Sequence, residues 1–194
     1  MTSWLYKQWP YALIFAVPFL LVLLPFWSVA FGLPLTLVYL QLPIYMLHQI
    51  EEHYGDRFRT YFNAQIGHGR ELLTPAAVFW INSLGIWVLD IILLYLSFFV
   101  DLSWSLPMIY IAVLNGITHI MTTVRSRRYN PGLWTSIFLF LPLGIWSACV
   151  ISAASHATWY AHALGVAAAI LLHLLIIAYI FRPKKKDQGL PATP

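Results

Sequence analysis

Residues 8–50 read QWPYALIFAVPFLLVLLPFWSVAFGLPLTLVYLQLPIYMLHQI and contain no Asp, Glu, Lys or Arg. A helix needs roughly 20 predominantly apolar residues to cross the hydrocarbon core of a bilayer. This stretch is long enough for two crossings, so it predicts two consecutive membrane-spanning helices. Acidic side chains follow directly after it, at Glu51 and Glu52. The end of the second helix is therefore where this chain brings charge close to hydrocarbon.

The rest of the chain repeats this pattern of long apolar blocks. Residues 102–124 and 129–181 also lack Asp, Glu, Lys and Arg, and residues 72–100 contain only Asp90. Of the 194 residues, 60% are hydrophobic and 9% are charged, whereas soluble domains average about 25% charged residues. We predict an all-α fold, a polytopic transmembrane bundle of about six helices that forms a single membrane domain over residues 1–194. The predicted helices are 11–31, 33–49, 75–99, 105–123, 133–151 and 159–181.

The basic residues are confined to the two ends of the chain and to alternate connections. Lys7 precedes the first predicted helix. The others follow the second, fourth and sixth helices: Arg57, Arg59, Arg70, Arg125, Arg127, Arg128, Arg182, Lys184, Lys185 and Lys186. Cytoplasmic loops carry an excess of Lys and Arg, so we predict a cell (inner) membrane protein with both termini cytoplasmic. Residues 182–194 are expected to form a basic, disordered cytoplasmic tail.

The net charge of +4 is explained by this topology. Basic residues at a membrane boundary orient the chain and contact anionic lipid. The sequence shows no soluble recognition module beside them, so we expect membrane lipids as partners and no nucleic acid.

The segment His48-Gln49-Ile50-Glu51-Glu52 is expected at the cytoplasmic end of the second helix. At about 100° per residue, Glu51 lies about 60° to one side of His48 and Glu52 about 40° to the other, so all three can face one pocket. His53 is turned about 140° away and is expected at the membrane interface. An imidazole and a carboxylate at this spacing can bind one divalent cation. The alternative is a helix end with solvated charges, but ionisable groups beside hydrocarbon are costly and usually functional.

The fourth predicted helix offers a second imidazole. His119 lies near its cytoplasmic end, and Asn115 is one turn away on the same face, where it could support a ligand by hydrogen bonding. The alternative for His119 is a buried histidine that hydrogen bonds a neighbouring helix. Tyr129-Asn130-Pro131-Gly132 has strong turn chemistry. Its functional interpretation is that the turn places Tyr129, or Arg125 or Arg128 before it, over the pocket.

These residues resemble the HXXEE-domain family of small integral membrane proteins. The motif that names the family reads His48-Gln49-Ile50-Glu51-Glu52 here, and the Tyr-x-Pro-Gly motif of the family reads Tyr129-Asn130-Pro131-Gly132. The further histidine of the family corresponds to His119. The resemblance extends from the second predicted helix through the fifth. It implies an enzyme of no established reaction and supports the same site residues.

Other polar residues lie within or beside the apolar blocks. Asp90, in the middle of the third helix, is expected to have a structural or supporting role, or to carry protons. His173 is about 12 Å from the cytoplasmic end of the sixth helix and could reach the site. His68 lies in a Gly-His-Gly loop that could cover the site, although loop histidines are usually solvated. His156 and His162 are expected near the outer surface.

Together these features predict a metal-dependent enzyme acting on a lipid-like or isoprenoid substrate at the cytoplasmic edge of the bilayer. His48, Glu51, Glu52 and His119 are the expected ligands, with zinc favoured and iron possible. Glu51, Glu52 and Tyr129 are the expected catalytic groups, the spare carboxylate being a general base that activates water for hydrolysis. Two alternatives stay open, a metal-free acid–base isomerase of lipids and a small proton- or metal-coupled transporter.

Overall fold

The computed structural model describes residues 2–182, and every regular element in that range is a helix. Six segments are long and apolar enough to cross a membrane: Ser3–Val22, Leu24–Gln65, Pro75–Phe99, Leu102–Ser126, Leu133–Ser155 and Trp159–Phe181. The predicted all-α bundle of about six spanning helices is therefore confirmed. The predicted disordered tail lies outside the described residues, except for Arg182.

The first two crossings differ from the predicted boundaries. The first helix, α1 (Thr2–Leu21), begins at Thr2 and not at residue 11, and α2 spans Leu24–His53. Gly32, with φ 73° and ψ 176°, interrupts the helical backbone of α2. The hydroxyl of Tyr39 donates to the carbonyl of Leu20, which shows that the chain reverses between these residues. Beyond Gly32 the helix continues to His53, so Glu51 and Glu52 are still helical.

The third and fifth crossings each contain a stretch of wider π-helix. The third consists of α4 (Pro75–Asn82), η2 (Ser83–Val88) and α5 (Leu89–Phe99). The fifth consists of α7 (Leu133–Thr135), η4 (Ser136–Phe140) and α8 (Leu141–Ser155). Short π-helical stretches occur frequently at functional sites. Here η4 begins directly after Thr135, which is a residue of the site described below.

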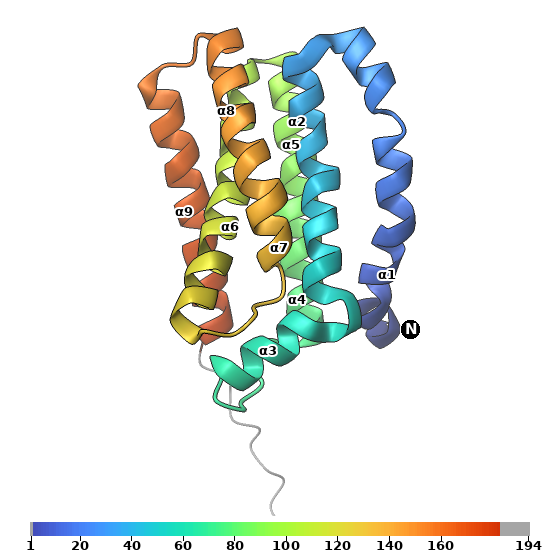
Figure 1. The fold of residues 1–194 in the computed structure, drawn as a ribbon, viewed down its shortest axis with the longest axis vertical. Coiled ribbons are helices and arrows are strands. Elements are labelled where there is room, and N and C mark those ends of the chain that lie inside the picture. Colours follow the sequence, from blue (N-terminus) through green and yellow to red (C-terminus); the bar gives the residue numbers. More distant parts are fainter. Residues whose placement is uncertain (1, 183–194) are drawn as a thin grey trace, which may run out of the picture.

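The remaining crossings are regular helices, α6 (Leu106–Ser126) and α9 (Trp159–Phe181), with η3 (Leu102–Ser105) preceding α6. Figure 1 shows α1 at one edge of the bundle and α9 at the opposite edge. A Cβ atom on Gly165 of α9 would lie 2.9 Å from the ring of Tyr110, and one on Gly144 of α8 would lie 2.4 Å from the side chain of Val113. Both neighbours are on α6, so α8 and α9 approach α6 closely at glycines, as membrane helices commonly do.

The short helix α3 (Arg57–Gln65) follows η1 (Tyr54–Asp56) and lies across one end of the bundle. The start of α1, the α6–α7 connection and the end of α9 lie at the same end (Figure 1). We call this the basic end, because it carries the described basic residues Lys7, Arg57, Arg59, Arg70, Arg125, Arg127, Arg128 and Arg182. Its position on the cytoplasmic side stays a prediction.

Candidate metal centre

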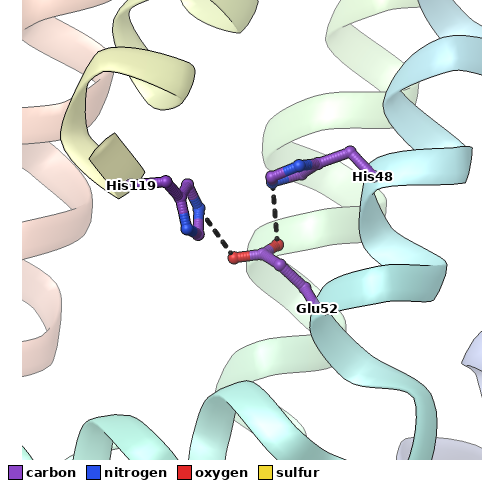
Figure 2. A group of neighbouring side chains, drawn as sticks. All are labelled: His48, Glu52 and His119. Atoms are coloured by element: carbon purple, nitrogen blue, oxygen red, sulfur yellow. Dashed lines mark ion pairs between the residues drawn. The ribbon is translucent and has the colours of Figure 1, made fainter. Parts of the chain in front are cut away.

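Three potential metal ligands from two helices meet near the basic end. His48 and Glu52 come from one face of α2, and His119 comes from α6; the carboxylate lies between the two imidazoles (Figure 2). Nε2 of His119 lies 3.1 Å from Oε1 of Glu52, and Nε2 of His48 lies 3.4 Å from Oε2. One ligand atom from each residue lies within 4.8 Å of the others, and all three side chains are buried. Two imidazoles and one carboxylate form a common ligand set of catalytic zinc sites.

Hydrogen bonds determine which ring nitrogen of His48 carries its proton. Nδ1 of His48 lies 2.8 Å from Oγ1 of Thr135, and that hydroxyl lies 2.6 Å from Oε2 of Glu51. An ionised carboxylate only accepts and a hydroxyl has one proton, so Thr135 donates to Glu51 and accepts from Nδ1 of His48. Nε2 of His48 therefore keeps its lone pair, which accepts from Nδ2 of Asn115 at 3.1 Å, and it lies 3.4 Å from Oε2 of Glu52. Histidine ligands of metals are usually oriented in this way, through a hydrogen bond from the other ring nitrogen.

The carboxylate of Glu51 is fully engaged outside this cluster. It accepts hydrogen bonds from the hydroxyls of Tyr129 and Thr135 and from the backbone N–H groups of Trp134 and Thr135, at 2.6 to 3.1 Å. The N–H groups in the first turn of a helix have no partner within the helix, and here Glu51 supplies one. Although Glu51 was expected among the ligands, the structure places it as a cap on α7 that joins α2 to the fifth crossing.

The last residue of the segment Tyr129–Gly132 lies directly against the cluster. Gly132 has φ 98°, and a Cβ atom there would lie 2.7 Å from Cε1 of both His48 and His119 and 2.9 Å from Cγ of Glu52. Only glycine fits this close approach. Burial and the hydrogen bond to Glu51 raise the pKa of Tyr129 to about 12, so its hydroxyl remains a donor over the physiological pH range.

His53 departs from its expected interfacial position. It is buried, and its Nε2 lies 3.2 Å from Oε2 of Glu52. Helical periodicity gave the wrong environment because α1 packs against that side of α2, where the Trp9 ring lies 5.1 Å from that of His53. The carboxylate of Glu52 is long enough to contact histidines on both of its sides.

A series of hydrogen bonds determines that Nε2 of His53 is an acceptor. The indole N–H of Trp87 donates to Oε1 of Gln49, whose Nε2 donates to Oδ1 of Asn82. Nδ2 of Asn82 then lies 3.2 Å from Nε2 of His53. An indole N–H can only donate, so each amide is oriented in turn and Nε2 of His53 must accept. In the sequence, the only indication of this series of hydrogen bonds is the pair of amides, Gln49 and Asn82, within apolar helices.

Two buried polar atoms near the cluster have no hydrogen-bond partner in the described part of the chain. They are Nδ1 of His119 and Oδ1 of Asn130. Asn115 is better satisfied, because its Nδ2 lies 3.1 Å from Nε2 of His48. Unpaired buried groups cost roughly 1–3 kcal/mol each, and they mark this pocket as a place where a ligand would find partners.

A cavity of about 380 Å³ adjoins the cluster, lined by residues of α2, α3, α4, α6 and α9. Glu52, His53, His119 and His173 are among its lining residues. Nδ1 of His173 lies 2.8 Å from the carbonyl of Ala169. A carbonyl only accepts, so this nitrogen carries the proton, and Nε2 of His173 is an acceptor with no hydrogen-bond partner among the described residues.

The other predicted site residues lie elsewhere. Asp90 is buried in α5, does not line the cavity, and its Oδ2 has no partner among the described residues. Arg125, Arg128, His68 and His156 are exposed. His162 lies in the first turn of α9, where it is half-buried and its ring hydrogen bonds Tyr110 and Ser152; its place near the outer surface stays a prediction.

Comparisons with known proteins give one match. A family model described as "protein of unknown function with HXXEE motif" matches residues 39–147, which is more than half of the chain. His48, Glu51, Glu52, His119 and Gly132 all lie within the matched range. No curated protein and no solved structure matches the chain.

Proposed function

The chain belongs to the HXXEE family, and we propose that it is a metal-dependent enzyme of the membrane, a hydrolase of a lipid-like substrate. The observation that carries this proposal is the buried group of His48, Glu52 and His119, whose ligand atoms lie within 4.8 Å of one another. Because the group borders a cavity of about 380 Å³, a substrate can reach it. Cavities of this size are typical of small-molecule sites.

The donor and acceptor roles in these hydrogen bonds support the binding of a cation between His48, Glu52 and His119. Nε2 of His48 and Nε2 of His53 are both unprotonated, and each accepts a hydrogen bond from an amide, Asn115 and Asn82 respectively. They also lie 3.4 and 3.2 Å from the same carboxylate oxygen of Glu52. Three electron-rich atoms this close together in a buried site repel one another, and a positive charge beside them would be stabilised. A metal ion bound to His48, Glu52 and His119 would supply that charge. Nitrogen and oxygen ligands of this kind suit zinc or iron.

Each residue of the group then has a distinct part. His48, Glu52 and His119 would hold the metal, while Glu51 and Thr135 hold the ring of His48 in its orientation. Three protein ligands leave a coordination position open, and a metal in such a site lowers the pKa of water and polarises a carbonyl or phosphoryl oxygen.

The general base is a different residue from the one that the motif suggested. The spare carboxylate, Glu51, accepts four hydrogen bonds and cannot approach a substrate without losing them. His173 lines the cavity, and its Nε2 is an acceptor because Nδ1 donates to Ala169. We assign His173 as the base, with Glu51 and Tyr129 as positioning residues.

Metal-free acid–base catalysis is the second candidate, and one contact favours it. Nε2 of His119 and Oε1 of Glu52 lie 3.1 Å apart, so these two groups can share a proton without a metal. A positioned pair of this kind is sufficient for isomerisation of a lipid.

Elemental analysis of the protein, purified in detergent without chelators, separates the two candidates. We expect about one zinc or iron per chain and its loss in the His48→Ala, His119→Ala double variant. His68→Ala is the control, because His68 is exposed and lies outside the cavity. Absence of metal from the wild type even after metal is added, or equal metal in the double variant, would contradict the metal-dependent mechanism.

A further inference from the structure

The mouth of the 380 Å³ cavity can be located from the exposure of its lining residues. Most of the lining is buried or half-buried, including Glu52 and His119. Ile66, Ile177 and Phe181 line the same cavity but are 37%, 51% and 53% exposed. Ile66 directly follows α3, and Ile177 and Phe181 lie in the last turns of α9. Thr118 of α6 also lines the cavity and is exposed. The cavity therefore opens between α3 and α9, beside α6.

This mouth faces the side of the bundle and not only its end. The exposed side chains along α9 are apolar: Leu164, Leu171, Leu174, Leu175, Ile177 and Phe181. A spanning helix that presents such a surface faces hydrocarbon. The rings of Phe62 on α3 and Phe181 on α9 lie 6.5 Å apart beside the mouth, so both of its edges are apolar.

The walls of the cavity differ in polarity. The wall from α6 is polar and consists of Asn115, Thr118, His119 and Thr122. The walls from α3, α4 and α9 are mainly apolar, with Phe58, Phe62, Val78, Ile81, Ile176 and Ile180. A molecule that satisfies both kinds of wall is amphiphilic, with its polar end against α6 and Glu52 and its apolar chain toward the mouth.

Size and charge narrow the class of amphiphile further. The cavity of about 380 Å³ is near the lower end of the range of roughly 300–1,000 Å³ found for small-molecule sites. A cavity of this size favours one acyl chain over the two chains of a membrane phospholipid. The described lining residues include no Lys or Arg, so a phosphate would find no basic side chain within the cavity.

Building on the function proposed above, we propose that this cavity admits a single-chain lipid sideways from the bilayer, between α3 and α9. The polar end of that lipid is uncharged, as in a fatty acyl ester, and lies against Glu52 and His119. A substrate of this kind brings a carbonyl to the proposed metal site while its chain stays in apolar surroundings.

Photo-crosslinking in phosphatidylcholine nanodiscs tests this proposal. The probe is a medium-chain monoacylglycerol with a diazirine near the chain end. We expect adducts on the α3 and α9 residues that line the cavity. We also expect several-fold less labelling in Ile177→Trp or Ile66→Trp, which narrow the mouth. Leu174→Trp is the matched control, since Leu174 is exposed on the same helix but does not line the cavity.

The proposal is overturned by equal labelling of Ile177→Trp and Leu174→Trp. Equal or stronger labelling by a two-chain phospholipid probe or by a single-chain phosphate probe would also overturn it. Metal content, measured on the same samples, keeps the two proposals apart. Bound metal without specific labelling removes the substrate class and leaves the metal centre, whereas specific labelling without metal supports the lipid cavity and removes the metal-dependent mechanism.

Discussion

Single residues around the carboxylate of Glu52 decide whether this site can hold a cation. The direction of each neighbouring hydrogen bond is determined by a group that can only donate or only accept. On one side the indole of Trp87 only donates, and on the other the carboxylate of Glu51 only accepts. Each series of hydrogen bonds leaves Nε2 of a histidine, His48 or His53, without a proton and within 3.4 Å of Glu52. The residues that orient His48 and His53 are therefore as informative about the site as the ligands.

Thr135 tests the orientation of His48. In Thr135→Val the shape is kept but the hydroxyl between Glu51 and His48 is lost. Removing such a supporting group typically lowers metal affinity about 10–100-fold, and we expect a loss of that size in competition with a chelator. Thr135→Ser should restore most of the affinity. Unchanged affinity in the valine variant would show that the hydroxyl does not orient the ligand.

Gly132 tests the close approach of the turn. A Cβ atom would lie 2.7 Å from both imidazoles, and the positive φ adds strain, so we expect Gly132→Ala to lose its metal and to be destabilised by about 1–3 kcal/mol or more. Gly69→Ala is the matched control, since Gly69 has φ 83° with no described atom within 4 Å of that position. Metal content and thermal unfolding measure the difference, and equal effects in the two variants would count against the geometry.

Tyr129 gives the site a defined dependence on pH. Its pKa is raised to about 12 from an ordinary value of 10.0 by burial and by Glu51. The hydrogen bond is therefore fully present below pH 10, and its contribution to stability is lost as the pH rises through about 12. The difference in tyrosinate absorbance between the wild type and Tyr129→Phe should show a transition near pH 12. A transition at pH 10 would contradict this environment.

At the level of helices, the half of the bundle away from the basic end contains a contact that only resembles a catalytic one. Nδ1 of His162 on α9 lies 2.6 Å from the hydroxyl of Tyr110 on α6, and its Nε2 lies 3.0 Å from Oγ of Ser152 on α8. Ser152 donates to the carbonyl of Ala148, so His162 donates to the serine and cannot remove its proton. This arrangement joins three helices and does not activate a nucleophile.

His162→Ala should consequently separate stability from function. We expect a loss of about 1–3 kcal/mol from the hydrogen bonds to Tyr110 and Ser152, seen as a lower midpoint of thermal unfolding. The metal content should stay at the wild-type value, because the site is built from other residues. Loss of metal at temperatures where the variant is folded would show that the contact of His162 with Tyr110 and Ser152 supports the site.

Part of the site could be predicted from helical periodicity and part could not. His48 and Glu52 share a face because they are four residues apart, and the length of the apolar blocks predicted the spanning helices. The environment of His53 depends on α1 packing against α2, and the position of Glu51 depends on where α7 begins. Both are contacts between segments far apart in the sequence, which local periodicity does not contain.

For the whole molecule, the proposed site, the mouth of the cavity and the basic residues all lie toward one end of the bundle. Basic segments are retained on the cytoplasmic side, so we expect the chemistry to face the cytoplasm. In a Cys149→Ser background, a membrane-impermeant maleimide added outside cells should label His156→Cys and not His68→Cys. Both positions are exposed in connecting segments. The reverse labelling would place the site on the outer side.

The central claim is that His48, Glu52 and His119 bind one metal ion, and X-ray absorption spectroscopy of the metal-bound protein tests it most directly. We expect nitrogen and oxygen ligands at about 2.0–2.2 Å with the scattering pattern of two imidazoles. The pattern should be lost in the His48→Ala, His119→Ala variant. A sulfur ligand at about 2.3 Å, or a spectrum that the double substitution leaves unchanged, would place the metal elsewhere and contradict the account.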